Sequence, residues 1–213
     1  MENKLYSKVF LWLFVGLMIT FITGYYTSVN EAALNAIFKK GMYVVFIIIE
    51  VALALILSIR LHKMSATTAK FCYLLYTFIS GLTFSSILVE FKLESIMFVF
   101  GITSVLFLIF AVIGLKTNID LSKLSTYLLI GLFGIIIASI LNIFINSETF
   151  NLGIVILSIL IFVGYTAFDI QRIKQLEGTL DDDNVAILGA FNLYLDFINI
   201  FIDLLRLFGE SDN

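Results

Sequence analysis

The sequence predicts an all-α membrane protein with seven transmembrane helices. Three observations support this: 61% of the 213 residues are hydrophobic, only 14% are charged, and the apolar residues form long continuous runs. A soluble domain is roughly 45–50% apolar and about 25% charged, and a chain of this length cannot bury the excess in a water-soluble core. The runs are also too long, and too free of alternation, to be the strands of a membrane β-barrel.

Seven windows reach the length of about 20 apolar residues that crosses a hydrocarbon core of about 30 Å. In chain order they are residues 9–29, 41–60, 69–90, 95–115, 124–146, 150–173 and 185–208. The first window is longer than the apolar region of a signal peptide, and no small-residue cleavage site follows it, so we expect a retained helix. The spans use most of the chain, which predicts a single transmembrane domain over residues 1–213.

Charged or Asn- and Ser-containing segments separate the spans, and their Lys and Arg residues predict the orientation. With the N-terminus inside, nine basic residues gather on the inner side: Lys4, Lys8, Arg60, Lys63, Lys70, Lys116, Lys123, Arg172 and Lys174. Four lie on the outer side: Lys39, Lys40, Lys92 and Arg206. The excess on the first side predicts a cytoplasmic N-terminus.

Composition also excludes several classes of protein. The high hydrophobicity excludes intrinsic disorder, and a net charge of −3 without a basic stripe argues against nucleic-acid binding. A single histidine, His62, excludes a multi-histidine metal site, and a single cysteine, Cys72, excludes an intrachain disulfide. No span carries the interior lysine of a retinal protein, and the Gly-x-Gly-Asp and proline elements of intramembrane aspartyl proteases are missing. We therefore expect that the protein is not an enzyme and holds no cofactor. We also expect it to be a monomer.

The ionisable residues inside the spans are the candidates for function, because a charge at the bilayer centre costs at least about 2.5–3.5 kcal/mol. Four are acids, namely Glu50, Asp169, Asp196 and Asp203, and none is a deeply placed base. An acidic interior favours cations or protons over anions. Glu50 is either a cation ligand in a cavity or a buried acid that is hydrogen-bonded to a neighbour.

The seventh span carries a polar stripe. At 100° per residue its polar residues fall within an arc of about 80°: Asn192, Asp196, Asn199, Asp203 and Arg206. Such a stripe must face the bundle interior or a watery cavity, where it serves either as a hydrogen-bonding contact between helices or as part of a transport path. Asn192, Asn199 and Asp203 are therefore candidate pore-lining or cation-attracting residues.

Asp169 and Asp196 lie on consecutive spans, but their heights above the inner ends of those spans differ by about 8 Å, so the spacing leaves their pairing open. If they meet, they share one proton and titrate as a unit. The alternative partner of Asp169 is Arg172, one turn away. Arg60 is either an anchor to lipid headgroups or a base that reaches Asp169.

The run 181–184 is expected to be a solvated loop that ends in a helix cap, with weak calcium attraction as the alternative.

The segment 192–209, NLYLDFINIFIDLLRLFG, resembles the signature of the Bax inhibitor-1 family, in particular its bacterial YetJ-type members. Phe168–Gln171, Tyr76–Gly81 and Ile49–Val51 also fit that family. The resemblance implies two three-helix layers around a central C-terminal helix. It further implies a pH-sensitive calcium leak in a bacterial plasma membrane, gated by an aspartate pair at Asp169 and Asp196, with Arg60 as the arginine that pairs with them.

On this resemblance, calcium ions and protons are the expected partners, and calcium is the transported ion. Whether Asp169 and Asp196 bind calcium themselves is left open. Two other classes also fit the residues. A secondary cation/proton exchanger would use the same acids as a carrier site. A non-transporting regulatory scaffold would use the polar stripe only to join helices.

Overall fold

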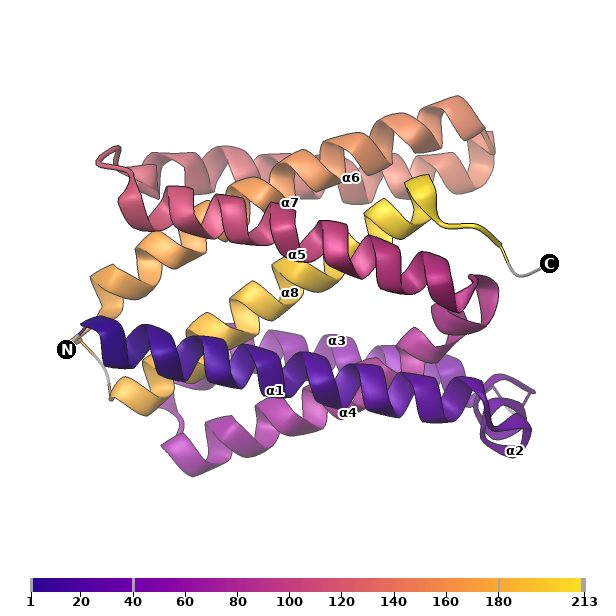
Figure 1. Ribbon diagram of the computed structural model, residues 1–213, viewed down its shortest axis with the longest axis horizontal. Coiled ribbons are helices and arrows are strands. Elements are labelled where there is room, and N and C mark those ends of the chain that lie inside the picture. Colours follow the sequence, from indigo (N-terminus) through magenta and orange to yellow (C-terminus); the bar gives the residue numbers. More distant parts are fainter. Residues whose placement is uncertain (1, 40, 180, 212–213) are drawn as a thin grey trace. The chain divides into compact units, whose positions relative to one another are not determined.

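The computed structural model describes residues 2–39, 41–179 and 181–211, and seven of its helices are long and apolar enough to cross a membrane (Figure 1). They are α1 (Glu2–Ser28), α3 (Met42–Arg60), α4 (Ala66–Glu90), α5 (Leu93–Lys116), α6 (Leu124–Ile145), α7 (Glu148–Leu176) and α8 (Asp182–Phe208). The predicted fold class is confirmed, and each helix covers most of its predicted span. Lys40, one of the predicted outer-side lysines, lies outside the described residues.

Short elements that the sequence analysis did not predict lie between the long helices. The one-turn helix α2 (Glu31–Leu34) and a π-helical segment (Asn35–Lys39) separate α1 from α3. Asn30 caps α2, since its side-chain oxygen accepts a hydrogen bond of 3.1 Å from the amide of Ala33. Turns of 3₁₀-helix precede α4 and α6, at Leu61–Lys63 and Leu121–Lys123. Elements this short carry too few residues for a hydrophobic period to reveal them.

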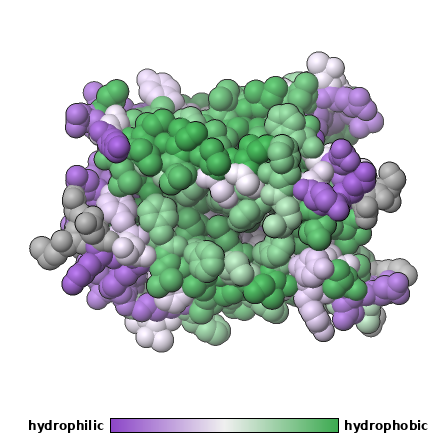
Figure 2. Space-filling model, in the orientation of Figure 1, coloured by the Kyte–Doolittle hydropathy of each residue, from purple (hydrophilic) through white to green (hydrophobic). Residues whose placement is uncertain are grey.

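The chain divides into two compact units, and each has three of the long helices and part of α8. The first unit contains α1 to α4 and the start of α8 as far as Tyr194. The second contains α5, α6, α7 and α8 from Leu195 onward. Of the seven spans, α8 has the largest buried share. Hydrophobic side chains cover most of the visible face, and hydrophilic ones gather toward its two ends (Figure 2).

In the first unit, α1 packs closely against α4 because the contact is made by small residues. Gly81 of α4 lies directly against α1: a Cβ atom added there would stand 2.7 Å from Thr23 Cβ and 2.8 Å from the carbonyl oxygen of Thr20. Gly24 of α1 lies in the same contact: a Cβ atom added there would stand 3.1 Å from the carbonyl oxygen of Gly81. These glycines therefore allow the two backbones to approach.

In the second unit, α7 is the helix against which α5 and α6 pack. Gly114 of α5 lies against the backbone of Ala167, and a Cβ added to Gly164 would stand 2.9 Å from the side chain of Leu128 on α6. A buried apolar cluster joins α6 to α7 through Leu128, Ile135, Ile154 and Ile161. On α8, Phe197 packs against Phe100 and Phe107 of α5, with ring centroids 5.4 and 5.5 Å apart. Close packing therefore fixes the helices on which the acidic residues stand.

We expect Gly81→Ala to destabilise the protein by about 1–3 kcal/mol, because the added methyl group overpacks the contact between α1 and α4. The measurement is thermal unfolding of the purified protein in detergent. Gly134→Ala is the matched control, since nothing lies within 4 Å of a Cβ added at Gly134. Equal unfolding temperatures for the two variants would contradict the close approach of α1 and α4.

Candidate functional site

The polar stripe of α8 is buried along most of its length. Asp196 and Asp203 are 3% and 6% exposed, whereas Asn192 and Asn199 are half-buried and Arg206 is exposed. Asn199 uses its amide nitrogen within its own helix, where it donates a hydrogen bond of 2.7 Å to the carbonyl oxygen of Leu195. The carboxylates are therefore the groups of the stripe that are most removed from water.

Asp169 of α7 and Asp196 of α8 lie close enough for the charge of one to act on the other. Asp169 is 6% exposed, and its negative charge acts on Asp196 within the second unit. The charges of both carboxylates also reach Tyr165, one turn before Asp169 on α7. The Oδ2 atom of Asp196 is buried, and no hydrogen-bond partner for it is found among the described residues. Two acids that repel each other when both are charged thus share an interior from which water is largely excluded.

Asp203 has a different environment from Asp196, although both lie on the same side of α8. The hydroxyl group of Ser158 on α7 lies close to the carboxylate of Asp203. The guanidinium of Arg206, three residues further along α8, lies 3.7 Å from Oδ1 of Asp203. Asp203 therefore has a basic residue beside it, which Asp196 has not been shown to have.

Glu50 lies in the first unit, near the middle of α3, and is half-buried. Its Oε2 atom accepts a hydrogen bond of 2.7 Å from the hydroxyl group of Thr83 on α4. The charge of Glu50 reaches Tyr76 on α4 and Tyr194 on α8. A hydrogen bond to Thr83 is compatible with both alternatives for Glu50, which stay predictions.

The basic residues considered as partners of Asp169 are both exposed. Arg60 is the last residue of α3 and belongs to the first unit, whereas Asp169 belongs to the second. Arg172 stands one turn beyond Asp169 on α7. The pairing of Arg60 with the two aspartates stays a prediction.

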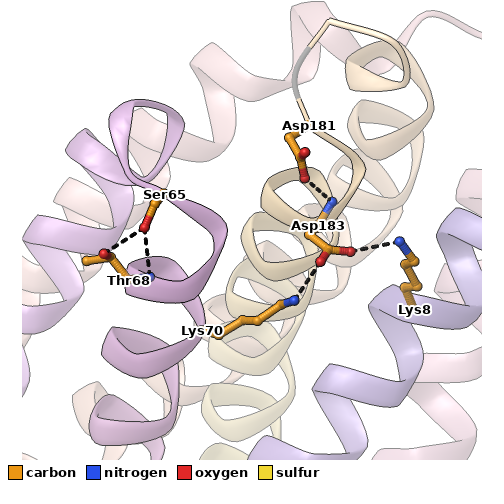
Figure 3. Close-up of polar contacts among 6 residues, drawn as sticks. All are labelled: Lys8, Ser65, Thr68, Lys70, Asp181 and Asp183. Atoms are coloured by element: carbon orange, nitrogen blue, oxygen red, sulfur yellow. Dashed lines mark hydrogen bonds and ion pairs between the residues drawn. The ribbon is translucent and has the colours of Figure 1, made fainter.

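The run 181–184 contains the predicted helix cap but little of the predicted loop, because α8 already begins at Asp182. Asp181 accepts a hydrogen bond of 2.8 Å from the amide of Asp183 and so caps the helix. Asp183 bridges two helices: Lys8 of α1 lies 2.7 Å from Oδ1 and Lys70 of α4 lies 2.5 Å from Oδ2 (Figure 3). Asn184 is buried and donates a hydrogen bond of 3.0 Å to the carbonyl oxygen of Met64.

Sequence reasoning also missed a group of buried hydroxyls in the first unit. The hydroxyl oxygen of Tyr194 lies 2.7 Å from Oγ1 of Thr20 on α1 and 3.0 Å from Oγ of Ser80 on α4. The hydropathy signal does not distinguish such hydroxyls from small packing residues.

Among the described residues, no group of three or more His, Cys, Asp or Glu side chains is placed to hold a metal ion.

The fold and these residues define a polytopic helical membrane protein with carboxylates in its apolar interior. Comparison with known families is specific: the family model described as "Inhibitor of apoptosis-promoting Bax1" matches residues 2–213. The chain therefore belongs to the Bax inhibitor-1 family, as its C-terminal motif predicted.

Relatives of similar length occur in several bacteria. A protein of Borreliella burgdorferi is 41% identical over 218 residues, which cover 100% of this chain and 94% of that protein. The inner membrane protein YbhL of Escherichia coli K12 is 34% identical over 211 residues, covering 96% and 90% of the two chains. A membrane protein of Streptococcus pyogenes serotype M1 is 31% identical over 216 residues, covering 99% and 94%. Two of these three relatives are thus named as membrane proteins, and one of them as an inner membrane protein.

We expect Asp183→Asn to lower the unfolding temperature, because it weakens the ion pairs that tie the start of α8 to α1 and α4. The difference from the unsubstituted protein should shrink as salt is raised, since these side chains are partly exposed and their interactions are screened. Thermal unfolding in detergent at low and high salt measures both effects. Asp182→Asn is the control, because Asp182 is exposed and neighbours Asp183. A salt-independent loss of stability would contradict an ionic role for Asp183.

Proposed function

We propose that this protein is a pH-sensitive calcium leak channel of the bacterial inner membrane, gated by Asp169 and Asp196. The observation that supports the proposal is the mutual interaction of two buried carboxylates, one of which has a buried oxygen without a hydrogen-bond partner among the described residues. Such a pair binds a proton readily at low pH, and the shared proton removes the repulsion. The acidic interior agrees with cation passage, because carboxylates attract cations and repel anions.

The sign of the pH response follows from this chemistry. At low pH the pair holds a proton, the two carboxyl groups can hydrogen-bond to each other, and the closed state is favoured. As pH rises the pair loses that proton, the two negative charges repel, and the gate loosens. In this scheme Arg60 pairs with the aspartates in the closed state. Leak should therefore increase with pH.

The other polar residues have places in the same scheme. Glu50, Asn192, Asn199 and Asp203 line the path or attract the cation, because carboxylate and amide oxygens are ligands that calcium accepts. Asp203 is the candidate of this group that has a basic residue beside it, since Arg206 lies 3.7 Å from its carboxylate. The N-terminus is cytoplasmic in this proposal, on the basis of the excess of Lys and Arg on that side.

In liposomes that contain only this protein, calcium entry should rise between about pH 5 and 8. For a gate controlled by one proton, the open fraction changes about tenfold per pH unit on the acid side of the midpoint. The double variant Asp169→Asn, Asp196→Asn should lose the pH dependence, because amides do not titrate in this range. Asp182→Asn makes the same chemical change at an exposed site and should keep it.

The same assay separates the alternatives. A leak passes calcium down either gradient without a counter-ion, whereas an exchanger acidifies or alkalinises the lumen in proportion to the calcium moved. Folded protein that passes no calcium at any pH would overturn the channel proposal and leave a structural or regulatory role.

Asp203→Asn should reduce the calcium flux several-fold at every pH without moving the midpoint, because Asp203 attracts the cation but does not belong to the gate. The check is the ratio of flux in Asp203→Asn to flux in the unsubstituted protein, measured across the full pH range. A shifted midpoint with unchanged maximal flux would instead assign Asp203 to the gate. Ser158→Ala is a useful companion, since it removes only the hydroxyl group close to Asp203.

A further inference from the structure

Three buried hydroxyl groups meet where α1, α4 and the start of α8 pack together in the first unit. This hydroxyl cluster consists of Thr20, Ser80 and Tyr194, which are 1%, 4% and 0% exposed. Tyr194 is its centre, since its hydroxyl oxygen lies within hydrogen-bond distance of both other members. Thr20 in turn lies 2.9 Å from the carbonyl oxygen of Thr77 and can donate to it. The cluster thus joins three helices through one side chain of α8.

The hydrogen count makes Tyr194 necessary to the cluster. Each hydroxyl has one proton to donate, and the short contact between Thr20 and Tyr194 requires that one of them donates to the other. Either Thr20 donates to Tyr194 and Tyr194 donates to Ser80, or Tyr194 donates to Thr20 and Thr20 donates to the carbonyl oxygen of Thr77. Both arrangements use the hydroxyl of Tyr194, and both tie α8 to α1.

Aromatic packing fixes the ring that carries this hydroxyl. The rings of Tyr73 and Tyr76 on α4 meet the ring of Tyr194 edge-on, with centroids 6.4 and 5.7 Å apart. Tyr73 also donates a hydrogen bond of 2.9 Å to the carbonyl oxygen of Trp12 on α1. Besides these two tyrosines, the titratable group whose charge reaches Tyr194 is Glu50 of α3. Tyr194 therefore has one well-defined position against α1 and α4.

Tyr194 and Asp196 lie on nearly opposite sides of α8. Two residues correspond to a rotation of about 200° and a rise of about 3 Å along the helix. On the side of Asp196, the titratable groups within reach are Asp169 and Tyr165 of α7. The α5 side chains on this side are apolar: Phe100 and Phe107 pack on Phe197, the residue after Asp196. A rotation of α8 that released Tyr194 would turn Asp196 by the same angle, because α8 is continuous from Asp182 to Phe208.

We propose that Tyr194 is a positioning residue for the aspartate gate: through the hydroxyl cluster it holds α8 in the rotation at which Asp196 meets Asp169. The inference rests on the proposed function and extends it to a residue outside the gate. Loss of the cluster favours the open state. A net hydrogen bond of the usual strength changes an equilibrium about fivefold, which for a gate controlled by one proton displaces the pH midpoint by about 0.7 unit.

The experiment compares the pH profiles of calcium entry into liposomes for matched pairs of variants. Tyr194→Phe removes only the central hydroxyl, and Thr20→Val replaces a hydroxyl by a methyl group of similar size. Both should leak at lower pH than the unsubstituted protein. Thr20→Ser keeps the hydroxyl and should restore the original midpoint. Tyr26→Phe is the control for loss of a tyrosine hydroxyl, because Tyr26 is on α1 and 65% exposed.

The outcomes separate this inference from the proposed function. If the unsubstituted protein leaks with a pH midpoint and Tyr194→Phe and Thr20→Val share that midpoint, the positioning role is overturned while the channel stands. If the unsubstituted protein passes no calcium, the proposed function itself fails. If Tyr194→Phe does not fold, the comparison of Thr20→Val with Thr20→Ser decides. A lower pH midpoint for Thr20→Val than for Thr20→Ser supports the positioning role of the hydroxyl cluster, and equal midpoints refute it.

Discussion

Burial of carboxylates in an apolar interior is the constraint on which the arrangement of this protein depends. Asp169, Asp196 and Asp203 are all nearly inaccessible to water, and an ionised carboxylate in such a place is unfavourable unless it is paired or hydrogen-bonded. Asp203 has a hydroxyl group and a guanidinium beside it, whereas Asp196 has a second acid. The same side chain on the same helix thus meets two environments, one that contains a guanidinium and one that contains a second carboxylate.

The two sides of α8 have different chemistry for the same reason. Inside a membrane each polar group must find its partner within the protein, because lipid supplies none. The side of Tyr194 satisfies this requirement with uncharged hydroxyls, whose hydrogen bonds do not depend on pH in the range where carboxylates titrate. The side of Asp196 satisfies it incompletely, with an interaction that depends on protonation. A fixed attachment and a pH-dependent contact are therefore combined in one helix.

Hydropathy and helical periodicity predicted the seven spans and the polar stripe of α8, because both are properties of consecutive residues. They did not predict that Asp169 and Asp196 interact, since the height of one helix against another depends on packing. That height also depends on where α7 ends, at Leu176, and where α8 begins, at Asp182. The bridge from Asp183 to Lys8 and Lys70 was missed because its partners are 175 and 113 residues away. Hydropathy and periodicity give no measure of the distance between residues so far apart in the chain.

The hydroxyl cluster itself depends on the close approach of α1 and α4. Ser80 precedes Gly81, the residue whose missing side chain lets the backbone of Thr20 come close to α4. If a side chain stood at position 81, Thr20 would move away from α4, and Tyr194 could no longer reach Thr20 and Ser80 together. The packing of two helices and the polar attachment of a third are therefore one interaction rather than two. A change at Gly81 should act on the rotation of α8, and through it on Asp196, as well as on stability.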